Sequence, residues 1–348
     1  MNFDLDENQE MFKAAVERFC GSTDIPARLA SRRMPGGFNR ARWQELAELG
    51  LIGLAASEDD GGMGGSLLDL AVVAQALGHG QAAEPWLECG FIPARLLAGT
   101  EHGAAVIAGE AIAAFAFAEP GRRYVLEAQG MKVKGGRISG TKQFVLGGAA
   151  ADLFIVTAEV DGVTRLFVIP AWAEGIEIRP YPVADGGVAA MLTLRDVPVG
   201  EPLPANLAAV IDAARLMAAA EMAGIARRLF DDTLEYVKTR EQFNQPIGRF
   251  QVIQHRMVDA YAKVEGIQSA VYRAVLHPVA PMAAIKAHVA EEAIWVAHQA
   301  VQLHGGMGMS DDLGIGHGLK RIVLLSKLFG DPAGAILDYA RLDYAQAA

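Results

Sequence analysis

The chain has 348 residues, of which 52% are hydrophobic and 21% charged, and its 31 Lys and Arg against 41 Asp and Glu give a formal net charge of −10. Such a chain is too apolar for disorder and is long enough to bury two or three domain cores. An acidic surface repels phosphate polymers, so we expect no nucleic-acid partner. With only Cys20 and Cys89, a disulfide framework is excluded and a reducing compartment is expected.

The start of the chain and its longest apolar run both argue against export or a membrane span. Asp4, Asp6 and Glu7 do not suit a basic signal or transit peptide. The Ala-rich run at 207–230 is interrupted by charged residues, so it does not resemble a membrane span. We therefore expect a soluble, cytoplasmic protein.

The first zone, 1–112, has the pattern of helices. Asp6 followed by Gln9 resembles a capping box, and the apolar residues after it recur at helical spacing. A second helix should carry Trp43, and the glycine cluster 61–65 should break the chain.

The second zone, 113–205, changes to the period of strands. Gly135-Gly136 and Asp161-Gly162 each stand between two short runs of strand-forming residues, which is typical of hairpins. Closely spaced strands without intervening helices predict a small antiparallel β-barrel or sandwich.

The third zone, 206–348, returns to helices. Asp212 is a candidate N-cap for a helix that runs towards Thr239, and further helices are expected at 250–276, 282–304 and 319–329. Short connections between four long helices predict an up-down four-helix bundle. The fold class is therefore predicted as α+β, with an N-terminal helical domain (1–112), a central β-domain (113–205) and a C-terminal bundle (206–348).

Common catalytic motifs are missing from the sequence. The GG-x-GG cluster at 61–65 lies between predicted helices, so it is interpreted as a turn in preference to a dinucleotide loop. The eight histidines form no metal-ligand spacing, so we expect no metal site, and no GxSxG elbow is present.

Two segments of the third zone have a chemistry in common. Arg240 begins the run R-E-Q-F-N-Q-P-I-G, and Gln302 begins the run Q-L-H-G-G. Taken separately, the arginine suits a helix dipole and the glycines suit a helix stop. Together they suit a flavin dinucleotide, because a guanidinium neutralises a pyrophosphate and paired glycines let backbone amides approach closely.

The order of these motifs resembles the C-terminal domain of acyl-CoA dehydrogenases. Arg-x-x-Phe from 240, Phe-Gln at 250–251 and Gln-x-x-Gly-Gly from 302 follow that family's order. The run 43–51 and the later glycine cluster are similar to the family's N-terminal domain. Glu119-Pro120-Gly121 resembles the loop after its first β-strand, and 196–199 resembles its last strand.

The resemblance implies an oxidoreductase that forms the α,β-double bond of an acyl-CoA, with FAD as cofactor and an electron-transfer flavoprotein as electron acceptor. The family's FAD lies between subunits. In this chain, the residues that match those reaching into a neighbour's FAD site are Arg240, Phe243, Gln251, Gln302, Gly305 and Gly306. The resemblance also places Glu119 and Phe144 at the cofactor, although Phe144 could equally be strand core.

The residues expected for proton removal differ from the family pattern. The most direct alignment puts Gly330 where most relatives carry a glutamate, and a shift of one residue would put Asp331 there. Other relatives carry the base just before an arginine that Arg215 matches, and Ala214 occupies that place here. Arg215 is the candidate substrate-binding residue. Asp331 is the candidate base, and it could instead only order the turn before a proline.

The predicted β-domain also departs from the family. Ala118 stands where a threonine usually precedes the Glu-Pro-Gly run, and Arg122 and Arg123 follow that run in place of a serine. The family's tryptophan–threonine pair beside the flavin is represented by Phe144 and Leu146.

Together the departures predict the degenerate subunit of a heterotetrameric (α2β2) bacterial acyl-CoA dehydrogenase for bulky substrates such as steroid side chains. A paralogous subunit would then carry the base. Three alternatives stay open: a homo-oligomeric dehydrogenase that uses Asp331, a flavin-dependent monooxygenase, and an interaction protein without flavin.

Overall fold

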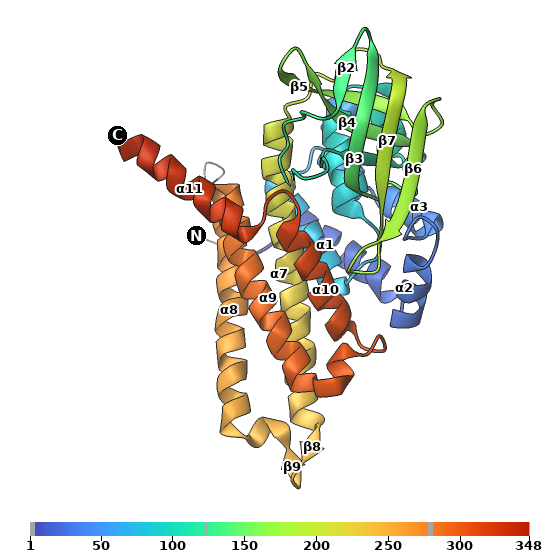
Figure 1. Cartoon of the computed structure of the whole chain (residues 1–348). Helices are drawn as coiled ribbons and strands as arrows, with labels where there is room; N and C mark the ends of the chain where they lie inside the picture. The colour runs from blue at the N-terminus through green and yellow to red at the C-terminus, as the bar shows by residue number, and fades with distance from the viewer. Residues whose placement is uncertain (1–3, 123, 278–280, 348) are drawn as a thin grey trace. The chain divides into compact units, whose positions relative to one another are not determined.

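The computed structural model describes residues 4–122, 124–277 and 281–347. Its α-helices are α1 (Glu7–Gly21), α2 (Ile25–Arg32), α3 (Arg40–Glu48), α4 (Leu67–Gly80), α5 (Ile92–Leu96), α6 (Glu101–Ile107), α7 (Leu207–Thr239), α8 (Gln251–Leu276), α9 (Met282–His304), α10 (Gly314–Lys327) and α11 (Pro332–Ala347). Its strands are β1 (Ala113–Ala116), β2 (Lys132–Lys134), β3 (Arg137–Leu146), β4 (Leu153–Val160), β5 (Val163–Pro170), β6 (Ile176–Pro182), β7 (Val188–Pro198), β8 (Glu241–Gln242) and β9 (Gln245–Pro246). Helices, a sheet and helices thus follow one another along the chain, as Figure 1 shows, and this confirms the predicted fold class.

The backbone divides into two compact units. We call the first the bundle unit, made of Met1–Pro26, Leu67–Ala82 and Arg215–Ala348. The second, the β-unit, is made of Ala27–Ser66 and Ala83–Ala214. The expected N-terminal domain therefore contributes helices to both units, and its division from the other two domains stays a prediction.

The β-unit is organised around a seven-stranded sheet in the order β1-β4-β2-β3-β7-β6, with β5 paired to β4. The predicted hairpins are confirmed, and Asp161 and Gly162 turn between β4 and β5 with φ of 50° and 80°. The β1–β4 and β2–β4 pairs are parallel, so the sheet is mixed and not wholly antiparallel. The direction of β2 relative to β4 depends on the path of the loop between β1 and β2, and no local sequence pattern reveals that path.

Helix α3 of the β-unit is linked to this sheet by an ion pair. Trp43 on α3 is 1% exposed, and the side chain of Asn39 caps the helix by accepting the N–H of Ala41. Arg40 donates to the carboxylate of Asp152 at 2.9 Å. The Arg40–Asp152 pair links α3 to the residue that precedes β4.

In the bundle unit, α1 packs against α4, which in turn contacts the long helices α7 and α8. The capping box of Asp6 and Gln9 is confirmed, and Gln9 also donates to Asp69 on α4 at 3.0 Å. A Cβ at Gly224 of α7 would lie 1.9 Å from the carbonyl oxygen of Gln75 on α4. Only glycine permits this approach of the two helices.

Helix α7 begins earlier than its sequence pattern predicts. Asn206 accepts the N–H of Ala209 at 3.1 Å and caps the helix, whereas Asp212 is an exposed residue of its second turn. The prediction that Asp212 is the N-cap is therefore wrong. Asparagine is as good a cap as aspartate, and apolar residues from Leu207 onward can already form helix.

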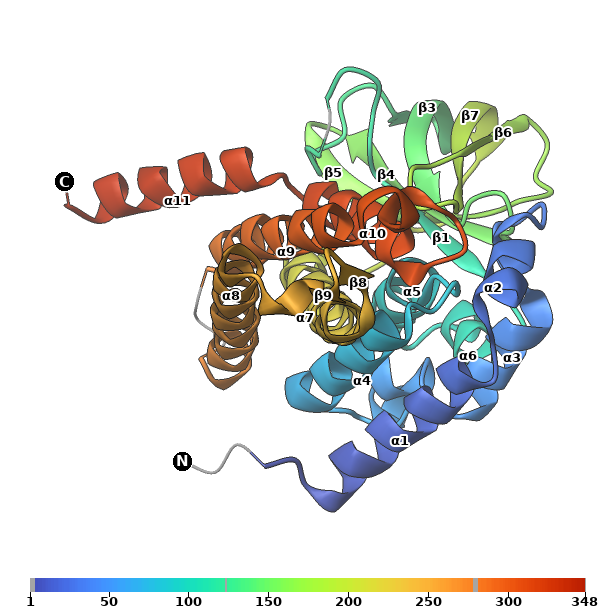
Figure 2. The same cartoon turned by 90° about the horizontal axis from the view of Figure 1, so that it is seen from below.

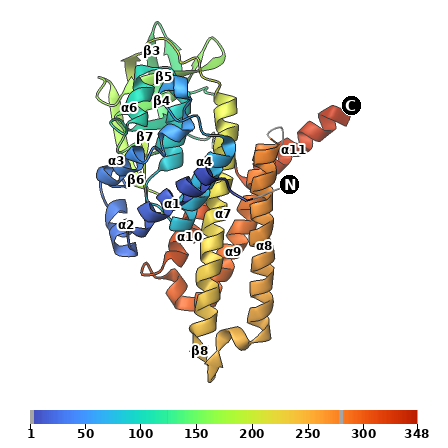
Figure 3. The same cartoon turned by 180° about the vertical axis from the view of Figure 1, so that it is seen from behind.

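The helices α7, α8, α9 and α10 run side by side in the bundle unit (Figures 1 and 2). The β8–β9 hairpin between α7 and α8 lies at the same end as the 3-10 turn η5 (Gly305–Met309) between α9 and α10 (Figure 3). The bundle therefore brings two connections that are some 60 residues apart in sequence to one end. Among the residues that the structure describes, no helix is long and apolar enough to cross a membrane.

Candidate functional site

The two connections at this end of the bundle present one set of exposed groups. We call this set the bundle-end cluster, and every member is exposed in the single chain. Its side chains are a guanidinium, an aromatic ring and two carboxamides, and its backbone has two glycines in sequence. The cluster consists of Arg240, Phe243, Gln251, Gln302, Gly305 and Gly306.

A ring stack between α7 and α9 lies next to both halves of the cluster. The rings of Tyr236 and His304 lie with their centroids 4.2 Å apart and their planes at 23°. The N–H of Arg240 donates to the carbonyl of Tyr236 at 2.8 Å, and Gly305 directly follows His304. Each half thus begins next to one of the stacked rings.

The β8–β9 hairpin exposes Phe243 in a strained conformation. Phe243 and Asn244 have φ of 54° and 61°, the left-handed region that few residues other than glycine occupy. The Phe243 ring is 85% exposed and meets the ring of Phe250 edge-on, with centroids 6.1 Å apart. Two-residue hairpin loops of type I′ have a positive φ at both central residues, so the hairpin itself accounts for this conformation and presents the ring at its tip.

The glycine corner is open and needs glycine. Gly305 has φ 60° and ψ −137°, which a side chain would strain, and no atom lies within 4 Å of a Cβ built there or on Gly306. Phosphate and ribose oxygens could therefore approach this backbone closely. The exposed guanidinium of Arg240 and the carboxamides nearby are donors for such oxygens, so the residues present fit the nucleotide half of a flavin.

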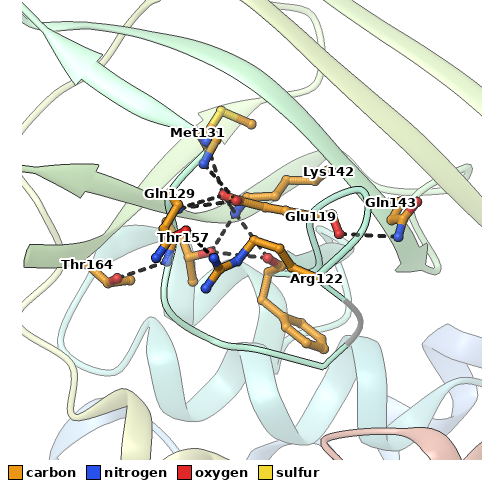
Figure 4. A network of polar contacts seen from close by, with 11 residues as sticks. Glu119, Arg122, Gln129, Met131, Lys142, Gln143, Thr157 and Thr164 are labelled. Carbon is orange, nitrogen blue, oxygen red and sulfur yellow. Dashed lines mark hydrogen bonds and ion pairs between the residues drawn. The ribbon is translucent and has the colours of Figure 1, made fainter.

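In the β-unit, Glu119 is bound by the chain itself. Its carboxylate accepts the N–H groups of Gln129 at 3.1 Å, Gly130 at 2.7 Å and Met131 at 3.0 Å, as Figure 4 shows. The residue is only 3% exposed. The structure therefore uses this carboxylate to hold the loop between β1 and β2, and the predicted cofactor role of Glu119 stays a prediction.

The partner of Glu119 is Lys142 on β3, which the sequence pattern did not single out. The Nζ of Lys142 donates to Glu119 at 3.0 Å, to Thr157 Oγ1 at 2.8 Å and to the Phe117 carbonyl at 3.0 Å (Figure 4). Burial by itself would raise the pKa of Glu119, but the backbone N–H groups and the ammonium outweigh it and lower this pKa to about 2. Burial lowers the pKa of Lys142 to about 8, although the carboxylate opposes the shift.

Phe144 lies two residues beyond this ion pair, at an irregularity in β3. The pairing with β7 shifts between Lys142 and Val145, and Phe144 has a φ of 53°. Its N–H donates to the Tyr181 hydroxyl at 2.8 Å, and its ring is 58% exposed. Phe144 is therefore not strand core, and its place at the cofactor stays a prediction.

The position where a base is expected holds no carboxylate of its own. Gly330 has φ 118°, and the atom nearest to a Cβ built there is Nη2 of Arg215 at 4.0 Å. Arg215 Nε donates to the Phe329 carbonyl at 3.0 Å, so the guanidinium holds this loop. The Asp331 carboxylate accepts the N–H of Gly334 at 2.9 Å and caps α11. A catalytic role of Asp331 and a substrate contact of Arg215 both stay predictions.

A buried lysine supports the same loop from α9. Lys286 is 2% exposed, and its Nζ donates to the carbonyls of Gly330 at 2.8 Å and Ser326 at 3.0 Å. Burial, together with the charges of Arg215 and Lys327, lowers the pKa of Lys286 to about 7.

Sequence patterns did not reveal the residues that support these sites, namely Tyr236, His304, Lys142 and Lys286. Each belongs to a regular helix or strand, and its partner is distant in sequence. A lysine at a position where its strand or helix should be apolar is the one local signal that could have indicated the two buried lysines. No group of His, Cys, Asp and Glu among the residues that the structure describes could hold a metal ion.

Comparison with known proteins gives consistent matches over most of the chain. Residues 206–332 match the family model "Acyl-CoA dehydrogenase, C-terminal domain", and residues 6–102 match "Acyl-CoA dehydrogenase, N-terminal domain". The chain is 31% identical to acyl-CoA dehydrogenase IpdE2 of Mycolicibacterium smegmatis over 93% of its own length and 94% of that protein's.

Solved structures match it as completely. A variant of the Tcur3481-Tcur3483 steroid ACAD superposes with a TM-score of 0.90 at 27% identity, over 98% of this chain and 99% of that one. The ChsE4-ChsE5 complex from Mycobacterium tuberculosis superposes with a TM-score of 0.86 at 26% identity, over 98% of each chain.

Proposed function

The chain belongs to the acyl-CoA dehydrogenase family, and from this premise we propose that it is a subunit of a heteromeric FAD-dependent acyl-CoA dehydrogenase. Its bundle-end cluster would complete the FAD site of a paralogous subunit that carries the base. As in the family, the enzyme is an oxidoreductase that acts on an acyl-CoA. The observation that carries the proposal is the open, exposed bundle-end cluster in a chain whose expected base position is Gly330.

The chemistry of the cluster suits the nucleotide half of FAD. Arg240 would neutralise the pyrophosphate, because a guanidinium can donate to two phosphate oxygens at once. Gln251 and Gln302 supply amide donors, and Gly305 lets the backbone approach. The chemistry that bound FAD would supply is acceptance of the β-hydrogen of the acyl-CoA as a hydride. The protein's share is to hold the cofactor and to place a base at the α-carbon.

In the proposed complex, the partner subunit supplies the catalytic base. Removal of the α-proton needs an acceptor within hydrogen-bond reach, and neither Gly330 nor Ala214 has one. The Asp331 carboxylate already accepts a backbone N–H at the start of α11. The lack of a carboxylate at both positions supports a partner that supplies the base, and the cap contact supports a structural role for Asp331.

The names of the matching structures support a heteromer and a substrate class. One is a complex of two named chains, and the other is called a steroid ACAD. We extend both properties to this chain as proposals: an α2β2 assembly that acts on a bulky acyl-CoA such as a steroid side-chain thioester. An electron-transfer flavoprotein is the proposed electron acceptor.

Co-expression with a paralogous acyl-CoA dehydrogenase subunit tests the proposal. We expect the chain alone to hold no flavin and to leave acyl-CoA unchanged, and the purified pair to be yellow and active. Flavin per chain is counted by absorbance after denaturation. If the chain alone binds FAD and bleaches it with an acyl-CoA, and Asp331→Asn abolishes this, the heteromeric role is wrong.

A further inference from the structure

The bundle-end cluster consists of two halves that no regular element joins. Arg240 follows α7, whereas Gly305 and Gly306 follow α9. A phosphate grip works only if its donors keep their positions to within about half an ångström. Something must therefore fix the end of α7 against the end of α9.

The ring stack of Tyr236 and His304 lies at this place. Its centroid distance of 4.2 Å and interplanar angle of 23° describe a close parallel contact between the last turns of the two helices. The imidazole is itself fixed, because its Nδ1 lies 2.8 Å from the carbonyl oxygen of Ala300 and the ring is buried. A carbonyl only accepts, so Nδ1 carries the hydrogen of this bond.

Each ring is coupled to its half of the cluster by backbone. The Tyr236 carbonyl accepts the N–H of Arg240 at 2.8 Å, one helical turn on. His304 precedes Gly305, and the turn that follows packs back onto α9, where a Cβ at Gly308 would lie 2.9 Å from the Val301 carbonyl oxygen. A shift of either ring would therefore move a donor of the cluster.

We propose that Tyr236 and His304 are positioning residues that hold the guanidinium of Arg240 and the Gly305–Gly306 corner as one grip on the FAD pyrophosphate. The inference rests on the proposed function. Neither ring needs to touch the cofactor, because both act through the backbone that they hold.

The test measures cofactor affinity in the complete complex of this chain with its partner subunit. FAD is titrated by the quenching of its fluorescence, and FMN, which lacks the adenosine half and the pyrophosphate, is titrated in parallel. We expect Tyr236→Leu to raise the Kd for FAD about tenfold and to leave the Kd for FMN nearly unchanged. Tyr236→Phe keeps the stacked ring and should stay within about twofold of the unchanged complex.

Tyr261→Leu is the matched control. Tyr261 on α8 meets Phe230 on α7 with ring centroids 5.9 Å apart, so this variant also removes an aromatic contact between bundle helices. It should leave both affinities unchanged. His304→Gln is the second variant, because its amide can still donate to the Ala300 carbonyl while the ring is lost. We expect it, too, to raise the Kd for FAD about tenfold and to leave the Kd for FMN nearly unchanged. It therefore tests the proposal even if Tyr236→Leu does not fold.

A double-mutant cycle separates positioning from general loss of structure. If the rings act through Arg240, then Tyr236→Leu should add less than about twofold to the loss caused by Arg240→Ala. Equal losses of FAD and FMN, or an FAD affinity that neither ring variant changes, would overturn the positioning role alone. A wild-type complex that holds no flavin would contradict the proposed function and this inference with it.

Discussion

The bundle-end cluster and the Glu119–Lys142 ion pair place charged and polar side chains in opposite environments. At the end of the bundle, Arg240 and the carboxamides are exposed and available to another molecule. In the β-unit, Lys142 and Glu119 are buried, and they form hydrogen bonds with each other and with other groups of the same chain. A buried charged pair can therefore stabilise the fold, whereas an exposed charged side chain remains available to a ligand.

The largest expected effect concerns the buried pair. Lys142→Met keeps most of the volume but leaves the Glu119 carboxylate without its cation, so we expect the free energy of unfolding to fall by about 3–5 kcal/mol. Urea denaturation of the full chain measures this. Lys132→Met is the control, because its pair with Glu159 at 3.3 Å is partly exposed, and it should cost less than about 1 kcal/mol. Equal losses of stability in the two variants would show that the buried pair stabilises the fold no more than the exposed pair does.

A second prediction concerns the buried Lys286, whose ammonium donates to backbone carbonyls. The pKa of Lys286 is lowered from 10.5 to about 7, so between these values the unfolded chain binds a proton that the folded chain has released. Stability should therefore rise with pH in this window, by up to about 1.4 kcal/mol per pH unit. Lys286→Met should flatten this slope in urea midpoints at pH 6 to 8, below the range in which Lys142 titrates, whereas Lys320→Met, which removes an exposed lysine of α10, should keep it. A parallel pH dependence in the Lys286 variant would refute the shift.

A third prediction concerns the contribution of Arg240 to FAD binding. Arg240→Ala removes the charged donor for the pyrophosphate, and hydrogen bonds to charged groups contribute about 1.5–3 kcal/mol. We expect the Kd of the mixed complex for FAD to rise roughly 10- to 100-fold, with little change in melting temperature. Lys238→Ala is the control, since Lys238 is an exposed cation two residues away that pairs with Glu235. If both variants weaken FAD binding equally, the effect comes from net charge alone.

The smallest expected effect concerns the helix cap. Asp331→Ala removes the acceptor for the Gly334 N–H and should lower stability by about 1 kcal/mol. Turnover of the mixed complex should stay within about twofold, because the base is proposed to lie on the partner. Loss of turnover by several orders of magnitude, with the melting temperature little changed, would instead identify Asp331 as the base.

Most of the fold was open to prediction because its signals are local. The capping box of Asp6, the turns at Gly135-Gly136 and Asp161-Gly162, and the helices α8 and α9 each depend on neighbours a few residues apart. The parallel pairing of β1 with β4 was not predictable, since it joins strands 40 residues apart that are separated by the β2–β3 hairpin. The cap of α7 was missed because Asn206 and Asp212 carry equally good local signals.

By itself, the amino-acid sequence determined the order of helices and strands, the family, and the residues of the bundle-end cluster, because motif spacing and side-chain period are properties of neighbouring residues. Only the tertiary structure decided that Lys142 pairs with Glu119, that Lys286 lies beneath Gly330, and that Tyr236 stacks on His304. These contacts join elements that are distant along the chain, and their chemistry depends on the loss of water around them, which exists only once the chain has folded.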